Sequence, residues 1–251
     1  MNQIKMLYRI FLMVRMGFST WFRVQDILVQ VFVSSVLYVV VFGFIFSRFT
    51  TIEYLIYITS GIAFIYSATI PIYPVGTLIH LAMGRTGYYS YVLPVPRWSI
   101  IAVRIIISIV LVIIATIITI ASYWLIAFDV RISLLIVFPF LALLTLMFSL
   151  LYATLAYIIK DVPKYFTIVP SLSIILSLIS TAYYPLTTLS YLPSILIEIA
   201  TLNPISLSAD ICRNLLGVLS QEFIYKFLIL IIEFLLILIT ATITLSKKLK
   251  I

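Results

Sequence analysis

Long runs of apolar residues, separated by short polar segments, dominate the chain. Crossing a bilayer takes about 20 apolar residues. Runs of about that length cover residues 27–46, 54–79, 100–128, 132–159, 166–183 and 223–245. They lack the two-residue alternation of outer-membrane strands. We therefore expect an all-α, polytopic membrane protein with six transmembrane helices, organised as a single domain over residues 1–251.

Composition supports a membrane protein. The chain is 64% hydrophobic and 10% charged, whereas soluble domains are about 45–50% apolar and about 25% charged. The formal net charge is +8, but the cations lie between apolar runs and form no patch interleaved with aromatic residues. We therefore expect the lipid bilayer, and no nucleic acid, as the charged partner.

The distribution of cations predicts the orientation. If the N-terminus is cytoplasmic, twelve of the 16 Lys and Arg residues fall on the inner side. Only Arg48, Arg131, Arg213 and Lys226 then fall outside. The positive-inside rule favours this arrangement. We expect a multi-pass protein of the cell membrane with both termini cytoplasmic.

The segment before the first apolar run is basic and partly apolar. Residues 1–25 place Lys5, Arg9, Arg15 and Arg23 among Met, Leu, Phe and Trp side chains. This pattern is typical of an amphipathic helix in the cytoplasmic interface. The alternative is a simple positive anchor for the first span. The interrupting cations argue against a cleavable signal peptide.

Several kinds of site are absent from the sequence. None of the seven glycines precedes a lysine, so a phosphate-binding GxxxxGK[ST] loop is excluded. His80 is the only histidine and Cys212 the only cysteine, which excludes paired-histidine zinc sites and disulfides within the chain. We therefore expect no catalytic residue, no metal site and no cofactor in this chain.

A segment with docking features follows the second run, at residues 80–98. Gly84 and Gly87 interrupt the helix, and Pro94 and Pro96 fix the chain before a new helix near Trp98. Aromatic side chains lie between the glycines and prolines. One interpretation is a short, stiff, aromatic segment that docks a soluble partner. The alternative is an ordinary interfacial loop.

The segment at residues 184–221 alternates prolines with apolar stretches too short to span. This predicts a pair of re-entrant or interfacial helices that cap the outer end of the bundle. Asp210 and Arg213 are three residues apart, so they can pair on one helical face. An inert surface loop is the alternative.

Two predicted spans carry small polar residues. Ser173, Ser177 and Ser180 are spaced to share one helical face. They serve either helix packing or an export path. The second span offers a similar face and then residues that can bend it; these are Tyr57, Ser60, Gly61, Ser67, Pro71, Pro74 and Gly76.

Glu233 lies near the middle of the last span. A charge there costs roughly 2.5–3.5 kcal/mol, which the surrounding apolar residues outweigh. An acid inside the membrane is a functional candidate for a proton, a cation or a substrate amine. The alternative is a structural role, with the carboxyl group protonated or bonded to a neighbouring helix.

These features resemble the membrane subunits of type-2 ATP-binding-cassette (ABC) exporters, both in their order along the chain and in the side of the membrane on which each is expected. The positions that carry the resemblance are Gly87, Leu93, Pro94, Arg97, Pro185, Leu192, Pro193, Asn203, Pro204 and Arg213. The resemblance implies two permease subunits, identical or related, bound to two separate ATPase subunits that hold ATP and Mg.

The resemblance also implies roles for residues. The ATPase-coupling element would be residues Gly87, Tyr88, Tyr89, Tyr91, Leu93, Pro94 and Arg97. Spans two and five would line the dimer interface and the export path. The polar pattern of the spans supplies the candidate path residues, which are Tyr57, Ser60, Ser67, Ser173, Ser177, Ser180 and Glu233. Pro185, Pro193, Asn203, Pro204 and Arg213 would belong to the outer cap.

The sequence thus predicts the permease subunit of an ATP-driven exporter. One alternative is a secondary transporter or channel that is driven by an ion gradient and uses Glu233. Inverted repeats would support that alternative, and the two halves show no convincing repeat. Another alternative is a membrane scaffold that transports nothing.

Overall fold

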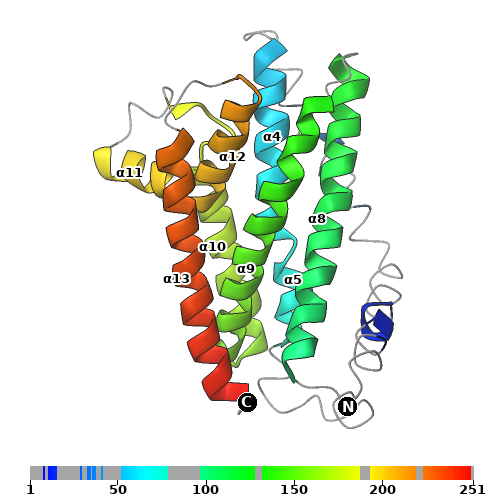
Figure 1. Ribbon diagram of the computed structural model, residues 1–251, viewed down its shortest axis with the longest axis vertical. Coiled ribbons are helices and arrows are strands. Elements are labelled where there is room, and N and C mark those ends of the chain that lie inside the picture. The colour runs from blue at the N-terminus through cyan, green and yellow to red at the C-terminus, as the bar shows by residue number, and fades with distance from the viewer. Residues whose placement is uncertain are drawn as a thin grey trace.

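The computed structural model is an upright bundle of long helices (Figure 1). It describes residues 52–78, 97–127, 132–186, 193–218 and 223–249, with isolated positions between 8 and 41. Within these ranges the regular structure is helical and no strand occurs. The all-α prediction is therefore confirmed.

Among the described residues, five stretches of helix are long and apolar enough to cross a membrane. They are Tyr54–Gly76, Trp98–Leu125, Ser133–Ile159, Val162–Ile179 and Phe223–Ser246. These match the second to sixth predicted spans. The first predicted span, 27–46, and the predicted interfacial helix, 1–25, lie almost wholly outside the described residues, apart from helical positions such as 11–15.

The predicted bounds of the fifth span were wrong at both ends. Helix α10 (Val162–Ile179) begins where the Asp161 carboxylate accepts a hydrogen bond from the Lys164 N–H at 3.0 Å. Pro163 occupies the first turn, where a missing N–H costs nothing. The helix ends before Ser180, whose backbone is extended. An N-cap residue followed by proline indicates the start of this helix, and hydropathy alone does not show it.

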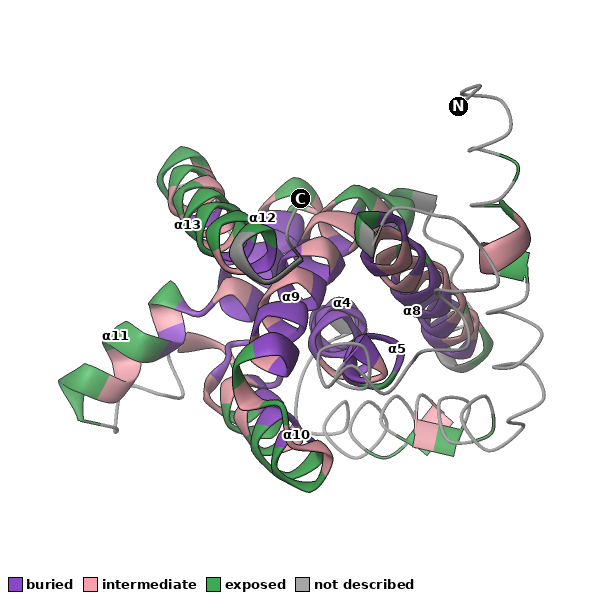
Figure 2. Ribbon diagram, turned by 90° about the horizontal axis from the view of Figure 1, so that it is seen from below, coloured by how far each residue is buried: buried purple, intermediate pink, exposed green. Residues whose placement is uncertain are grey.

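Helix α4 (Ile52–Thr69) lies at the centre of the bundle. It packs against α8 (Arg97–Ala127), α9 (Val137–Ile159) and α12 (Pro204–Leu215). Of the most apolar part of the span Tyr54–Gly76, 94% of the residues are buried, against 17% for the span Phe223–Ser246 in α13 (Phe223–Leu249). Figure 2 shows α4 and α9 inside, with α8, α10 and α13 around them.

The second span is broken. Helix α4 ends at Thr69 and α5 (Ile72–Gly76) begins at Ile72. Pro71 lies in the break, and proline has no N–H for the carbonyl four residues earlier. The helix is therefore interrupted at Pro71, whereas Pro74 and Gly76 lie inside α5.

The segment between the last two spans forms two helices at 68° to one another. Helix α11 (Ser194–Leu202) projects sideways from the bundle, whereas α12 runs along it (Figures 1 and 2). Every residue from Ile205 to Arg213 is buried. This burial excludes an inert surface loop for α12. A short 3₁₀ helix, η2 (Ile132–Ile136), precedes α9.

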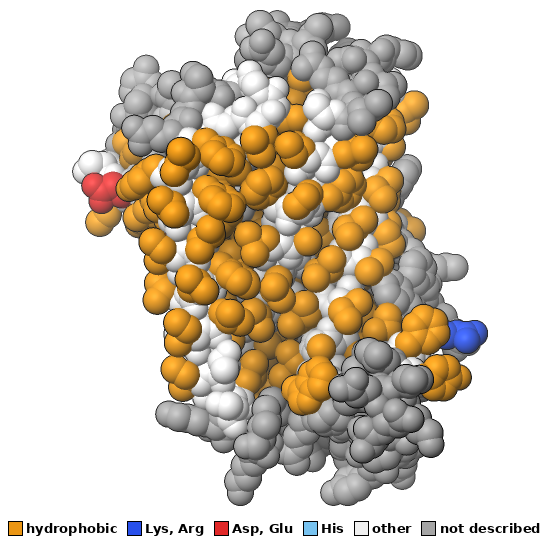
Figure 3. Space-filling view, in the orientation of Figure 1, with side chains coloured by type: hydrophobic (Ala, Val, Ile, Leu, Met, Phe, Trp, Pro, Cys, Tyr) orange, Lys and Arg blue, Asp and Glu red, His pale blue; other side chains and the backbone are white. Residues whose placement is uncertain are grey.

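The described outer surface is apolar along the height of the bundle. Hydrophobic side chains cover the face drawn in Figure 3, and charged ones are seen only at its margins. Large apolar residues on α10 and α13 are exposed, among them Ile174, Leu178, Ile224 and Leu236. Such a surface is satisfied by lipid tails and not by water, which places the bundle in a bilayer.

Candidate functional site

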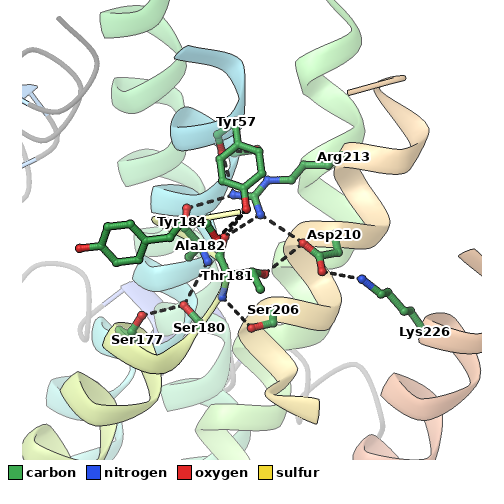
Figure 4. A network of polar contacts seen from close by, with 11 residues as sticks. Tyr57, Ser177, Ser180, Thr181, Ala182, Tyr184, Ser206, Asp210, Arg213 and Lys226 are labelled. Carbon is green, nitrogen blue, oxygen red and sulfur yellow. Dashed lines mark hydrogen bonds and ion pairs between the residues drawn. The ribbon is translucent and has the colours of Figure 1, made fainter. Parts of the chain in front are cut away.

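A buried arginine organises the upper part of the bundle as drawn in Figure 1. Arg213 on α12 has no exposed surface. Its Nη1 donates to the Thr181 carbonyl at 2.8 Å and to Asp210 Oδ1 at 3.2 Å. Its Nη2 donates to the Tyr57 carbonyl at 2.8 Å and to the Ala182 carbonyl at 3.0 Å (Figure 4). These four bonds join α12, α4 and the segment after α10, which offsets the cost of burying the guanidinium.

The segment after α10 supplies backbone acceptors because the helix has ended there. Ser180 caps α10, with its hydroxyl donating to the Ser177 carbonyl at 2.7 Å. The Ala182 N–H donates to the Ser180 hydroxyl at 3.2 Å, and the Thr181 N–H donates to the Ser206 hydroxyl at 2.9 Å. Irregular backbone inside a membrane requires such partners within the protein.

Tyr57 holds the same segment from α4. Its hydroxyl lies 2.7 Å from the Thr181 carbonyl oxygen and 2.9 Å from that of Tyr184, so its single proton is shared between these two acceptors. Its ring faces the guanidinium, with the Arg213 Cζ 3.3 Å from the ring centroid. This is a cation–π contact in a desolvated setting. One tyrosine therefore orients both the segment and the arginine.

Asp210 is the anion of the network. Its Oδ1 accepts from Arg213 and also from the Thr181 hydroxyl at 3.0 Å. Its Oδ2 accepts from Lys226 Nζ of α13 at 2.6 Å. The predicted Asp210–Arg213 pair is thus confirmed. One carboxylate links two cations from different helices, so it ties the mostly lipid-exposed α13 to the core.

Gly61 makes room for this arrangement. A Cβ atom at Gly61 would lie 2.0 Å from the Ala182 carbonyl oxygen and 2.8 Å from Arg213 Nη2. The neighbours at this position are backbone and a fully buried side chain, which cannot move aside. Only glycine lets the segment after α10 lie this close to α4.

The outer-cap residues fall in and around this network. Asn203 caps α12 by accepting from the Ile205 N–H at 3.0 Å, and its amide donates to the Leu176 carbonyl of α10 at 2.7 Å. Pro204 is the first residue of α12, and Pro193 is the N-cap of α11. Pro185 follows the Tyr184 that accepts from Tyr57.

The polar residues proposed for the export path are buried within the chain. On α10, Ser173 and Ser177 share the buried stripe with Tyr165 and Val169. The expected helical stripe is wrong for Ser180, because this residue lies beyond the helix end.

On α4, Ser60 donates to the Tyr57 carbonyl at 2.9 Å. Ser67 is buried, and its hydroxyl has no hydrogen-bond partner among the described residues. In this arrangement Ser60, Ser173 and Ser177 make contacts inside one subunit. Their role in an export path stays a prediction.

Glu233 lies on α13 one turn after the buried Leu230. Its Oε2 is buried and has no hydrogen-bond partner among the described residues. The predicted coupling residues Gly87, Tyr88, Tyr89, Tyr91, Leu93 and Pro94 lie outside the described residues, while Arg97 begins α8. Where the chain is described, no three metal-ligating side chains gather.

Lys226, Thr181 and Ser206 belong to the network but were not predicted from the sequence, which placed Gly61 only on a small, polar face of the second span. Lys226 carried a usable signal. It is a cation a few residues inside an apolar run, and such a charge needs a buried partner. The hydroxyls carried no comparable signal.

The comparison with known families adds one match. The sequence profile described as ABC-2 type transporter matches residues 8–217. No curated protein matches the chain.

Proposed function

The chain belongs to the ABC-2 type transporter family, and from this premise we propose that it is the permease subunit of an ATP-driven exporter. The family match is the observation that carries the proposal. Membership makes the chain a membrane subunit of an ABC transporter, which works with an ABC ATPase. Export as the direction, and energy from ATP hydrolysed on that partner, are the steps we add.

We further propose an assembly of two permease subunits, identical or related, with two ATPase subunits that hold ATP and Mg. The missing phosphate loop fits this division of labour. We place the cytoplasm at the lower end in Figure 1. Helix α5, the start of α8 at Arg97 and the start of α10 at Val162 meet there. That end also carries Lys160 and Lys164, as the positive-inside rule requires.

The proposed mechanism begins at the predicted coupling element, Tyr88 to Arg97. This element joins the second span to α8, so a movement imposed on it acts directly on α5. The upper part of the same span, α4, is held by Tyr57 and Arg213. The break at Pro71 separates the two parts. Closure of the ATPases would thus shift the lower part of the second span against a fixed upper part, opening and closing a path lined by spans two and five.

The test is reconstitution with and without an ATPase. Co-expression with a candidate ABC ATPase should give a complex that hydrolyses ATP, with a rate that responds to some members of a panel of lipids, drugs and peptides. Replacing Tyr88, Tyr89 and Tyr91 by alanine should abolish the response. Tyr225→Ala, at an exposed position of α13, is the matched control. Solute transport by the isolated chain in liposomes would overturn the proposal.

One observation favours a second candidate, a transporter driven by an ion gradient. The buried Glu233 oxygen, with no partner among the described residues, is a site for a proton or a cation. This candidate requires transport by the isolated chain along an imposed gradient, and its loss in Glu233→Gln.

A further inference from the structure

Two hydroxyl groups converge on one backbone carbonyl at the break of the second span. The Tyr152 hydroxyl of α9 donates to the Ala68 carbonyl at 2.6 Å. The Ser173 hydroxyl of α10 donates to the same oxygen at 3.2 Å. All three residues are fully buried. Ala68 is the last residue but one of α4, so both donors act at the edge of the break.

The break creates a need for such donors. Pro71 offers no N–H to the Ser67 carbonyl, and the regular ladder of hydrogen bonds ends with α4 at Thr69, so Ala68 lies in the last turn of the helix. Carbonyls in the last turn of a helix need partners from elsewhere, and in a membrane these come from neighbouring helices. Tyr152 and Ser173 are neighbours of this kind, and they bind α4 to both α9 and α10 at this level.

Below the break, the side-chain contacts of α5 are of a different kind. Ile72 and Val75 belong to the apolar core, and the Tyr73 ring stacks on Phe166 with centroids 6.5 Å apart. A Cβ at Gly76 would lie 2.8 Å from the Tyr165 ring. Apolar contacts are not directional, whereas hydrogen bonds fix an angle. The Ala68 contacts therefore fix the direction of the span at the break itself, whereas the apolar contacts of α5 fix no angle.

We infer that Tyr152 and Ser173 are positioning residues that lock the hinge between α4 and α5. While both hydroxyls bind the Ala68 carbonyl, α5 keeps one angle to α4. A force on the segment that follows α5 must loosen these bonds before α5 turns. This lock, formed by the two hydrogen bonds to the Ala68 carbonyl, is a property of this chain alone. Its use in coupling the ATPases to the second span rests on the proposed function.

The experiment measures the position of α5 directly. Spin labels replace the exposed residues Tyr73 on α5 and Ile117 on α8, in a chain whose buried Cys212 is changed to alanine. Pulsed electron resonance in lipid nanodiscs gives the distribution of the distance between labels. The test variant is Tyr152→Phe with Ser173→Ala. The matched control is Tyr165→Phe with Ser149→Ala, because these buried hydroxyls have no hydrogen-bond partner among the described residues.

We expect a single narrow distribution in the parent and in the control, and a broadened or second population in the test variant. Each bond lost should raise the population of the displaced state about fivefold. If the double variant does not fold, Tyr152→Phe and Ser173→Ala alone should each show part of the change. An unchanged distribution in the test variant, or equal broadening in the control, would overturn the lock.

A second measurement separates this inference from the proposed function. The complex with the ATPase is trapped with ATP and vanadate, which should shift the parent distribution towards the one that the test variant shows without nucleotide. If trapping shifts nothing while the test variant still broadens, the lock stands and the proposed coupling falls. If trapping shifts the parent and the test variant matches the untrapped parent, the coupling stands and the lock falls.

Discussion

The guanidinium carbon of Arg213 lies 3.3 Å from the centroid of the Tyr57 ring, although 156 residues separate them in the chain. The same arginine donates to the Tyr57 carbonyl, and the Thr181 carbonyl accepts from both the Tyr57 hydroxyl and Arg213. The two side chains therefore contact each other and both bind the segment after α10. This geometry makes the network sensitive to shape as well as charge.

Arg213→Lys should be strongly destabilising although the charge is kept. An ammonium group cannot reach carbonyls on two sides and also pair with Asp210, so buried acceptors lose their donors. We expect the free energy of unfolding to fall by about 3 kcal/mol, measured by titration with SDS in mixed micelles. Lys164→Met, at an exposed position, should change it little. Equal stability of Arg213→Lys and the parent would show that charge alone suffices.

Asp210 and Lys226 should be coupled in a double-mutant cycle. Asp210→Asn leaves two cations without their shared anion, so it should cost more than Lys226→Met, which removes one cation. We expect about 1–3 kcal/mol of coupling, with the double variant more stable than the sum of the single changes predicts. Additive effects would mean that the 2.6 Å contact between Lys226 and Asp210 contributes nothing to folding.

Gly61→Ala should destabilise the upper part of the bundle. The added Cβ would meet the Ala182 carbonyl at 2.0 Å, and something must shift. We expect a loss of about 1–3 kcal/mol. Gly217→Ala is a useful comparison, because Gly217 has a φ of 73° but open space around a Cβ. Its cost should be about 1 kcal/mol and arise from the backbone alone. A Gly61→Ala protein as stable as the parent would contradict the close approach.

Pro71→Ala should straighten the second span. Alanine supplies the N–H that the Ser67 carbonyl lacks, which favours one continuous helix. We expect a stable protein whose complex still hydrolyses ATP but transports less, measured with a substrate found in the ATPase screen. Pro74→Ala is the control, since Pro74 lies within the first turn of α5, where proline is tolerated. Full transport by Pro71→Ala would mean that the break has no part in the cycle.

Glu233→Gln should leave ATP-driven transport intact and raise stability slightly. The amide keeps the size of the side chain and removes a charge that is costly to bury at this depth. SDS unfolding and the ATPase assay check both statements. Glu198→Gln, on the exposed part of α11, is the control for loss of a carboxylate. Loss of transport in Glu233→Gln alone would instead favour the gradient-driven alternative.

The long spans were predictable because the thickness of the bilayer sets the minimum length of an apolar run that can cross it. The second span shows how far this extends. Pro71 indicated an interruption of this helix, but the two hydroxyls that bind the backbone beside it come from α9 and α10. Hydropathy reports how deeply a segment is buried and says nothing about which neighbours it meets.

The network around Arg213 was predictable only in its local part. The Asp210–Arg213 pair follows from helical spacing. The carbonyls of Thr181 and Ala182 lie 32 and 31 residues from Arg213, and a carbonyl acceptor has no signature in the sequence because every residue has one. The need for Gly61 likewise appears only once two distant segments are seen to touch.

The separation of 156 residues between Tyr57 and Arg213 also sets an order of events during biosynthesis. At typical translation speeds of about 5–20 residues per second, Arg213 emerges roughly 8–30 s after Tyr57. During that interval α4 enters the bilayer without the cation that later pins it, and the upper part of the bundle cannot close. A chain that ends before α12 would therefore leave its central helix without the Arg213 contacts to Tyr57.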